Sequence, residues 1–340
     1  LALAGRVAKV LAAEAFAPAA RLARDAAVAQ SLDVTVEARD ASEVTQRLVR
    51  EGRRFDVVIV NPPRRGLPPS VRADLARLGA SLVVYVSCEP TTLARDLADL
   101  VRRGLSPRSL SPFDMMPLTE EVETLAELAP APACAPEVIH SDERLIAVVK
   151  SPHEHTHGEA AGTLLARVRR LPGGEDAVPV QRADAETSGV CVFARRAEYR
   201  DELLRALRDG ETEYVALARG ILREKGSVRR PFTEHGRTLS ARTRYIRREV
   251  ISGHSLVSVR PDEGRRHQIH RHLASLGHPL IGDEIHGDPH TNHYFASKHL
   301  LDRPFLHCAR VRISAEGHEV LLEAPLAPDL VLAVTSLRGV

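Results

Sequence analysis

The sequence predicts two domains, an α/β domain over residues 1–130 and an α+β domain over residues 137–340. A chain of 340 residues exceeds the usual size of a single domain. Its first part alternates apolar strands with helices, which is typical of a parallel sheet with helices on both faces. Its second part runs through short strands in succession, with two helical stretches, which indicates an α+β domain.

In the first domain the predicted elements follow one another in a regular order. An apolar stretch at Val7–Ala13 leads into a helix that can begin near Pro18. Further strands are predicted at residues 34–38, 55–60 and 82–86, and further helices at residues 45–51 and 91–102. Ligands of such sheets bind at the carboxyl ends of the strands, so we expect Asn61 and Cys88 to lie at a functional edge.

A Pro- and Ala-rich stretch, residues 131–136, is predicted to be a semi-rigid linker. After it, strands are predicted at residues 145–149, 190–193, 213–218, 255–259, 311–313 and 320–322, and helices at residues 198–207 and 268–276.

The composition excludes several classes of protein. Hydrophobic residues make up 44% of the chain and charged residues 27%, as in globular domains. No apolar run reaches the ~20 residues that span a bilayer. The Ala-rich start does not indicate a targeting peptide, because Glu14 interrupts it, and Leu1 suggests that the chain begins inside a longer parent sequence.

The four cysteines indicate neither a disulfide framework nor a zinc site. They are Cys88, Cys134, Cys191 and Cys308, and no two form a C-x-x-C pair. Isolated cysteines suit a reducing cytoplasm.

Positive charge gathers in one part of the second domain. Residues 223–271 hold 13 Lys and Arg against five Asp and Glu. Such a patch can neutralise several phosphates, and it can equally be a solvated surface rich in arginine.

Two segments of the second domain carry candidate site residues. The first is Gln181-Arg-Ala-Asp-Ala-Glu-Thr-Ser-Gly189, in which Asp184 and Thr187 could by themselves simply form a turn. The second is Gly264-Arg-Arg-His-Gln-Ile-His-Arg-His-Leu273. Its three histidines lack the i,i+4 spacing of a helical zinc pair, so we expect no metal and favour a cationic helix start that faces phosphate.

These two segments, with Glu213-Tyr-Val-Ala-Leu-Ala-Arg-Gly220 between them, resemble the RluA-like pseudouridine synthases. The segments Gly287–Phe295 and Arg303–Cys308 are similar to the TruC-like subgroup, which modifies tRNA. The resemblance covers residues 137–340 and implies a pseudouridine synthase domain with a central, mostly antiparallel sheet.

The resemblance implies a nucleophile, Asp184, that acts either on the ribose or on the base. It implies that Tyr214 stacks on the base and serves in the final proton transfer, and that Arg182 and His270 complete the catalytic group. The reaction needs no cofactor or metal. The substrate is a structured RNA, tRNA or rRNA, and not DNA. The residues expected to contact it are Arg265, Arg266, His267, Gln268 and Arg271.

Three segments of the first domain resemble the TrmA-like RNA 5-methyluridine methyltransferases. They are Asn61-Pro-Pro-Arg-Arg-Gly66, Val86-Ser-Cys-Glu-Pro-Thr-Thr-Leu-Ala-Arg-Asp96 and Asp114-Met-Met-Pro-Leu-Thr-Glu-Glu-Val-Glu123. The resemblance implies an N-terminally truncated Rossmann-like domain that lacks its Gly-rich turn and whose cofactor is S-adenosylmethionine. The residues implied to act there are Cys88 (attack on carbon 6 of uracil), Glu123 (removal of the carbon-5 proton), Glu14 (cofactor ribose), Asp40 (toward the adenine) and Asn61 (cofactor site).

The chain departs from both family patterns at a few positions. Gln181 replaces a His, Ala183 replaces a Leu, and His270 replaces the Arg that would pair with Asp184. In the first domain Asn61 stands where the family has Asp. These departures leave a second hypothesis open, a catalytically impaired RNA-binding module that keeps the synthase fold.

Overall fold

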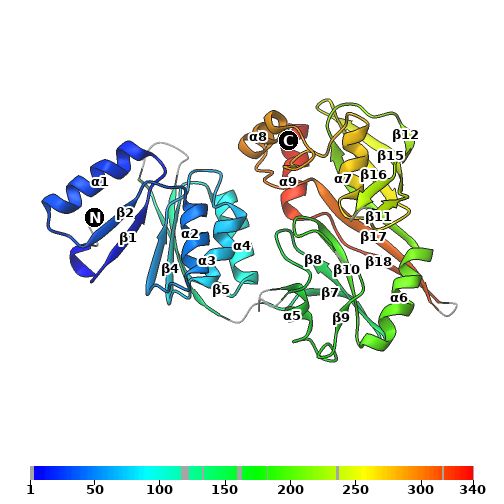
Figure 1. Ribbon diagram of the computed structural model, residues 1–340, viewed down its shortest axis with the longest axis horizontal. Helices are drawn as coiled ribbons and strands as arrows, with labels where there is room; N and C mark the ends of the chain where they lie inside the picture. Colours follow the sequence, from blue (N-terminus) through cyan, green and yellow to red (C-terminus); the bar gives the residue numbers. More distant parts are fainter. Residues whose placement is uncertain are drawn as a thin grey trace. The chain divides into compact units, whose positions relative to one another are not determined.

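The computed structural model describes residues 4–115, 122–131, 134–158, 163–181, 183–234, 237–315 and 318–339, without the side chains of 233–237 and 314–318. The chain forms two compact units, Leu1–Ala133 and Cys134–Val340 (Figure 1). The boundary between them falls inside the stretch predicted as the linker. No helix in the described residues is long and apolar enough to cross a membrane.

Unit 1 is an α/β unit, as predicted, with two sheets in its described residues, of which the larger is only partly parallel. Its elements are η1 (Ala4–Arg6), β1 (Val10–Ala13), α1 (Ala17–Ala29), β2 (Val34–Glu37), α2 (Ala41–Arg50), β3 (Val57–Val60), α3 (Pro69–Arg77), β4 (Leu82–Ser87), α4 (Pro90–Arg102), β5 (Leu105–Phe113) and β6 (Glu123–Pro130). Strand β1 pairs with β2 in parallel, and β3 pairs with β4 in parallel. The unpredicted strands β5 and β6 pair with each other and β6 with β4, all antiparallel. Prolines inside β5 weaken its strand signal.

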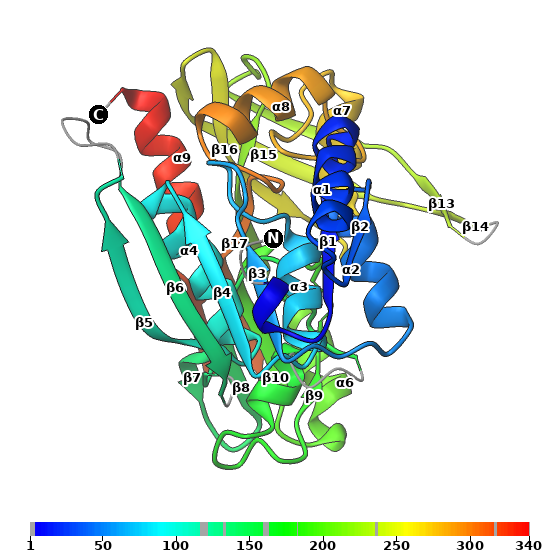
Figure 2. The same ribbon diagram turned by 90° about the vertical axis from the view of Figure 1, so that its left-hand side faces the viewer.

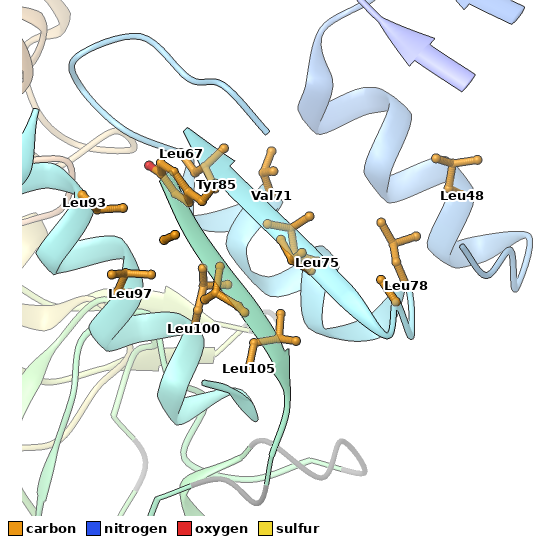
Figure 3. Packing of buried hydrophobic residues seen from close by; sticks show 14 of the residues in the cluster. Leu48, Leu67, Val71, Leu75, Leu78, Tyr85, Leu93, Leu97, Leu100 and Leu105 are labelled. Carbon is orange, nitrogen blue, oxygen red and sulfur yellow. The ribbon is translucent and has the colours of Figure 1, made fainter. Parts of the chain in front are cut away.

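The core of unit 1 follows from the alternation of β4. Val83 and Tyr85 point to one face and are fully buried. They pack against leucines of α3 and α4, among them Leu75 and Leu100 (Figure 3). The other face of β4 is only half-buried. The helices therefore hold one face of the sheet, and the carboxyl ends of β3 and β4 stay at its edge.

Unit 2 contains a long mixed sheet with helices at its faces. Its strands are β7 (Glu137–Ser141), β8 (Leu145–Lys150), β9 (Val178–Pro179), β10 (Ser188–Ala194), β11 (Glu211–Ala218), β12 (Lys225–Arg229), β13 (Phe232–Glu234), β14 (Arg237–Leu239), β15 (Arg242–Ile251), β16 (His254–Pro261), β17 (Leu306–Ala315) and β18 (His318–Glu323). Its helices are α5 (Leu164–Val168), α6 (Ala197–Asp209), α7 (Gln268–Ser275), α8 (Pro289–Lys298) and α9 (Pro328–Arg338).

The sheet of unit 2 runs β12-β15-β16-β11-β17-β10-β8-β7, with β18 beside β17 and β9 beside β10. Among its described pairings only β10 and β17 are parallel, so the predicted mostly antiparallel sheet is confirmed. The β13–β14 hairpin forms a separate two-stranded sheet that extends away from the body of unit 2 (Figure 2).

Strand β10 lies in the middle of this sheet and is buried along its whole length. Its apolar sequence therefore reflects burial on both faces. Helix α7 packs with Ile269 and Leu273 against Val257 and Val259 of β16. The segment that precedes β10 and the start of α7 carry the candidate site.

Candidate functional site

The candidate nucleophile Asp184 lies on a turn directly before β10. The turn closes through a hydrogen bond from the Thr187 amide to the Asp184 carbonyl, at 3.1 Å. The Asp184 side chain is 35% exposed, so a substrate can reach its carboxylate. Gly189 is required just after this turn, because it has φ +110° and a Cβ there would collide with the Cys308 backbone of β17.

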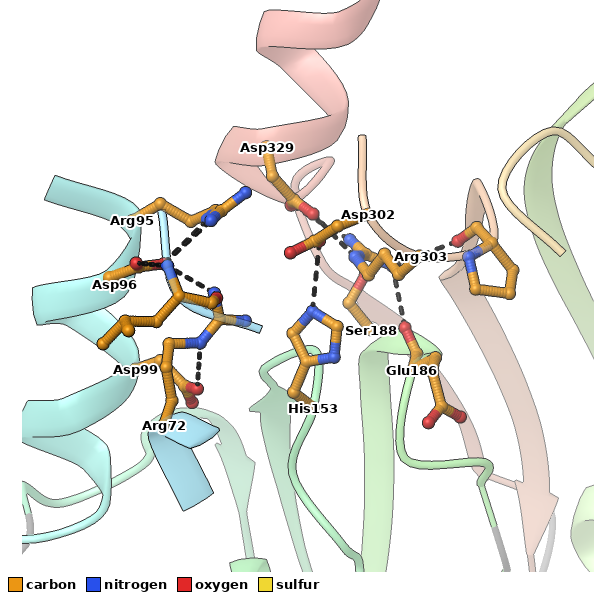
Figure 4. Close-up of polar contacts among 12 residues, drawn as sticks. Arg72, Arg95, Asp96, Asp99, His153, Glu186, Ser188, Asp302, Arg303 and Asp329 are labelled. Carbon is orange, nitrogen blue, oxygen red and sulfur yellow. Dashed lines mark hydrogen bonds and ion pairs between the residues drawn. The ribbon is translucent and has the colours of Figure 1, made fainter. Parts of the chain in front are cut away.

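Two buried cations hold the backbone of this turn. Lys150 donates its ammonium to the carbonyls of Ala185 and Thr187, at 2.7 and 2.6 Å. Arg303 donates to the carbonyl of Glu186 at 2.8 Å (Figure 4). Three consecutive carbonyls thus accept charge-assisted hydrogen bonds, which are stronger than neutral ones.

These cations are themselves fixed. Arg303 forms a two-point ion pair with Asp329, at 2.6 and 3.0 Å, and also donates to the Ser188 hydroxyl (Figure 4). Burial by itself raises the pKa of Asp329, but Arg303 outweighs it and holds that pKa below its usual value. Burial lowers the pKa of Lys150 to about 8. The sequence analysis did not identify Lys150. The only feature of the sequence that could have indicated it is a cation at the end of an apolar strand.

Tyr214 is brought beside the Asp184 turn by strand register. In β17, Cys308 pairs with Tyr214 on one side and with Gly189 on the other. Burial, then Cys308 and the negative Asp184, raise the pKa of Tyr214 well above its usual value. The phenol therefore stays protonated at working pH, with its ring packed between two core clusters.

The positive partner expected for Asp184 was His270, and the structure places a different histidine there. His267 Nε2 lies 3.7 Å from Asp184 Oδ1. His267 caps α7 with a left-handed backbone, φ 52°, a conformation rare outside glycine, and this turns its side chain away from the helix. Its proximity to Asp184 was not visible in the sequence.

His270 instead binds Asp283, through Nδ1 and Oδ2 at 2.9 Å. Its Nε2 is buried without a hydrogen-bond partner among the described residues. The His267 and His270 rings lie 5.2 Å apart, and His286 packs edge-on against both. No group of three or more His, Cys, Asp or Glu in the described part of the chain is arranged to hold a metal.

Asp283 is the anchor of this histidine cluster. Burial raises its pKa, but His270 and the amides of His286 and Ile285 outweigh that and lower it to about 2. A carboxyl whose folded pKa is depressed stabilises the fold above its unfolded pKa, and the effect disappears as pH falls through the folded pKa.

We therefore expect Asp283→Asn to lower the free energy of unfolding by about 2 kcal/mol at pH 7. Urea unfolding of parent and variant at a series of pH values measures this. The difference should shrink between roughly pH 4 and pH 2, the window set by the two pKa values. A difference that does not change with pH would contradict an ionised anchor.

The residues expected to bind RNA occupy different environments. Arg266 is exposed, and Arg271 stacks its guanidinium over Phe232 at 4.2 Å. Arg265 is partly buried, with its Nε lacking a partner among the described residues. Gln268 is buried, and Arg182 lies outside the described residues.

Gln268 is buried, and its side chain joins the start of α7 to β15. Its amide nitrogen donates to the Arg242 carbonyl at 2.9 Å, and its oxygen accepts from the Arg265 amide at 3.1 Å. A side chain bonded on both ends inside the protein has no free group for RNA, so its place is structural.

In unit 1 the structure brings Cys88 and Glu123 to one edge. Ser87 of β4 pairs with Thr124 of β6, and Cys88 and Glu123 are the next residues along these antiparallel strands. Cys88 is half-buried with a free thiol, and Glu123 Oε2 is buried without a partner among the described residues. Asn61 follows β3, which pairs with β4. Residues 116–121, in the middle of the segment Asp114–Glu123, lie outside the described residues.

A buried network fixes the loop after β3. Asp96 of α4 accepts from the Leu67 amide at 2.6 Å and from Arg72 at 2.5 Å. Arg72 also binds Asp99 at 2.9 Å, and Arg95 binds Asp96 at 2.9 Å (Figure 4). Arg95 and Asp96, at the end of the segment Val86–Asp96, therefore support this loop.

The acids expected to bind a cofactor lie on another sheet. Glu14 follows β1 and accepts from the Phe16 amide at 2.7 Å, while Asp40 caps α2 by accepting from the Ser42 amide at 2.8 Å. Both are exposed. In the described residues β1 and β2 form their own sheet, separate from β3-β4-β6-β5, so Glu14 and Asn61 do not share one continuous sheet.

Each unit matches a known protein family. Residues 144–275 match the family RNA pseudouridylate synthase, and residues 1–129 match the family tRNA (uracil-5-)-methyltransferase. The chain is 31% identical over 231 residues to ribosomal large subunit pseudouridine synthase D of Vibrio parahaemolyticus, covering 59% of this chain and 70% of that protein. It thus belongs to the RNA pseudouridine synthases, joined to a TrmA-like RNA methyltransferase domain.

Two further similarities define the extent of this relationship. An uncharacterised RNA methyltransferase of Geobacter sulfurreducens is 47% identical over 92 residues, which cover 27% of this chain and only 19% of that protein. The chain therefore spans about a fifth of that relative. The solved structure of human RNA pseudouridylate synthase domain containing 4 shares the fold, with a TM-score of 0.50 and 22% identity over 59% of this chain and 93% of that one.

Proposed function

We propose that unit 2 isomerises a specific uridine in tRNA or rRNA to pseudouridine, with Asp184 as the nucleophile. The observation that carries the proposal is the accessible Asp184 carboxylate on a turn clamped by Lys150 and Arg303. The clamped backbone of this turn loses little freedom when Asp184 attacks, which favours a nucleophilic route.

The reaction needs no oxidant or reductant, because pseudouridine is an isomer of uridine. Asp184 attacks carbon 1 of the ribose or carbon 6 of the base, and the bond from nitrogen 1 to the ribose breaks. The base turns, its carbon 5 bonds to the ribose, and the bond to Asp184 breaks, which frees the carboxylate. The carbon-5 proton leaves to solvent while nitrogen 1 takes up a proton. The target uridine must leave its stack to reach Asp184, and the Tyr214 ring would receive it.

In this site His267 takes the place of the expected cationic partner. Its ring lies closest to the Asp184 carboxylate, and the start of α7 adds the positive end of a helix dipole. We assign His270 a positioning role, because Asp283 holds it and its ring packs on His267.

Tritium release from RNA labelled at carbon 5 of uridine tests the activity directly. Parallel assays with tRNA and rRNA transcripts, followed by mapping of pseudouridine, would distinguish the two substrates. If neither RNA releases tritium yet both bind, the impaired RNA-binding module becomes the better description.

For unit 1 we propose a residual or partner-completed uracil-5-methyltransferase domain. Cys88 and Glu123 are the residues we assign to attack on carbon 6 and to removal of the carbon-5 proton, since both lie at one strand edge. S-adenosylmethionine would supply the methyl group. The acids expected to bind it do not fit one site, because they lie on a separate sheet and bind their own backbone.

We therefore expect the 340-residue chain to bind S-adenosylmethionine weakly, with Kd above about 1 mM, an affinity of about 4 kcal/mol or less. Isothermal calorimetry measures this at millimolar cofactor. A Kd in the micromolar range would contradict the divided site. Glu14→Gln should then weaken binding, which would restore the role first expected for Glu14.

A further inference from the structure

Two adjoining cavities open at the outer strand β12 of the unit 2 sheet. The larger measures about 460 Å³ and the smaller about 370 Å³. Both are lined by Lys225, Gly226, Ser227 and Tyr245, so both adjoin this strand. We call the two cavities together the β12 groove. The remaining lining residues are Leu222, Arg223, Arg242, Arg244, Ile246, Arg248, Ser258, Arg260, Leu276 and His278.

The larger cavity of the β12 groove lies mostly on the face of the sheet opposite Tyr214. Val259 pairs with both Tyr214 and Tyr245, so these three side chains share one face. Arg244 pairs with Arg260 in the adjacent register and faces the other way. The groove is therefore a place distinct from the candidate catalytic site.

The groove carries an excess of positive charge. Arg242 and Arg244 share one carboxylate, Asp262, and Arg248 and Arg260 share another, Glu213. Glu211 adds one more acid beside Arg260. Four guanidiniums thus face three carboxylates. Each guanidinium has five N–H donors, so paired arginines keep donors for a further anion.

Lys225 and Arg223 add to this excess. Both are exposed, and neither has an ion pair among the described residues. Lys225 lines both cavities, and Arg223 lines the smaller one. The groove therefore holds six Lys and Arg side chains in its lining against five neighbouring acids, Glu211, Glu213, Glu224, Asp262 and Glu263.

The backbone of β12, which forms the floor of the groove, can be approached closely by a ligand. A Cβ at position 226 would collide with the Tyr245 ring, so glycine there leaves room for that ring beneath the strand. Because β12 is the outermost strand of this sheet, alternate backbone amides on its free edge have no strand partner. Backbone amides and arginines together are the donors that phosphate oxygens accept from.

We propose that the β12 groove binds the phosphodiester backbone of RNA at a second site, separate from Asp184. The proposal rests on the proposed action of unit 2 on RNA, since charge complementarity is what selects RNA as the occupant. The groove would hold the flanking strand of a substrate, and sequence would not be read there because only phosphates are contacted.

The test is the salt dependence of RNA binding. The probe is a fluorescein-labelled 12-nucleotide oligouridylate, titrated by fluorescence anisotropy between 50 and 300 mM KCl. Lys225→Glu/Arg244→Glu should weaken binding at least about tenfold at 150 mM salt. The slope of log K against log salt should become less steep by about 1.4, at roughly 0.7 for each lost phosphate contact.

The matched control is Arg196→Glu/Arg200→Glu on α6, which reverses two charges on side chains that are 66% and 47% exposed. Thermal melting verifies that both double variants fold. The proposal is overturned if the groove variant binds like the parent, or if the control loses as much affinity. It is also overturned if polyglutamate competes as well as unlabelled RNA at equal charge, because the groove would then bind any polyanion.

Tritium release measured on the same preparations separates this proposal from the proposed function. A parent that binds RNA through the groove yet releases no tritium would leave the groove standing and remove the synthase assignment. If the parent releases tritium and the groove variant binds RNA as the parent does, the synthase assignment stands and the groove proposal is removed.

Discussion

Replacement of Asp184 by Asn is expected to lower pseudouridine formation by at least about a thousandfold. An amide of the same size can occupy the turn, but it is a far poorer nucleophile than a carboxylate. The clamps from Lys150 and Arg303 bind backbone carbonyls, so they should survive the change. Fold and RNA affinity should therefore remain close to those of the parent.

Tritium release with saturating RNA measures the turnover, and anisotropy measures the affinity. The matched control is Glu186→Gln, which neutralises an exposed carboxylate two residues away in the same turn. This control should keep parental turnover. Turnover of Asp184→Asn within tenfold of the parent would exclude Asp184 as the nucleophile.

Replacement of Lys150 by Met is expected to give the second largest effect, a loss of about a hundredfold in kcat with a smaller change in KM. Methionine fills a similar volume but cannot donate to the carbonyls of Ala185 and Thr187. The turn that carries Asp184 would then lose one of its two clamps. Stability should change less, because removing a buried charge offsets part of the lost hydrogen bonding.

The dependence on pH separates this positioning role from a merely structural one. The Lys150 ammonium donates to three carbonyls, including that of Ser151, whereas a neutral amine has only two N–H groups. Since burial lowers the Lys150 pKa to about 8, parental kcat should fall as pH rises above 8. Stability does not share this loss, because a depressed lysine pKa makes the folded state relatively more stable as pH rises from about 8 toward 10.5.

In Lys150→Met this alkaline fall in kcat should be absent, which rate profiles between pH 6 and 10 would show. Tyr214 does not confuse the measurement, since its pKa lies well above the usual value. The control is Lys298→Met, an exposed lysine at the end of α8. Parental kcat in Lys150→Met would show that Arg303 alone holds the turn.

The residue that lies beside Asp184 differs from the one expected from the family pattern. A histidine at position 270 is shorter than the arginine it replaces and carries one carboxylate bond, to Asp283. The histidine beside Asp184 is instead His267, three residues earlier, at the N-cap of α7.

Elements that depend on local order could be predicted from the sequence. The apolar run that became β10 and the period of α7 could be identified because their side-chain patterns repeat within a few residues. The same holds for Asp184, Tyr214, Cys88 and Glu123, whose neighbours along the chain form recognisable motifs. The strands β5 and β6 were missed because two prolines and weak alternation conceal them.

Only the tertiary structure decided which side chains meet. Lys150 contacts carbonyls more than 30 residues away, and Arg303 contacts one 117 residues away. His267, and not His270, lies beside Asp184. This depends on the left-handed backbone of His267 and on Asp283, which binds His270 from another segment of the chain. Such contacts are fixed by packing between distant segments, and no local pattern encodes them, because each side chain has several possible partners until the sheet brings one of them within reach.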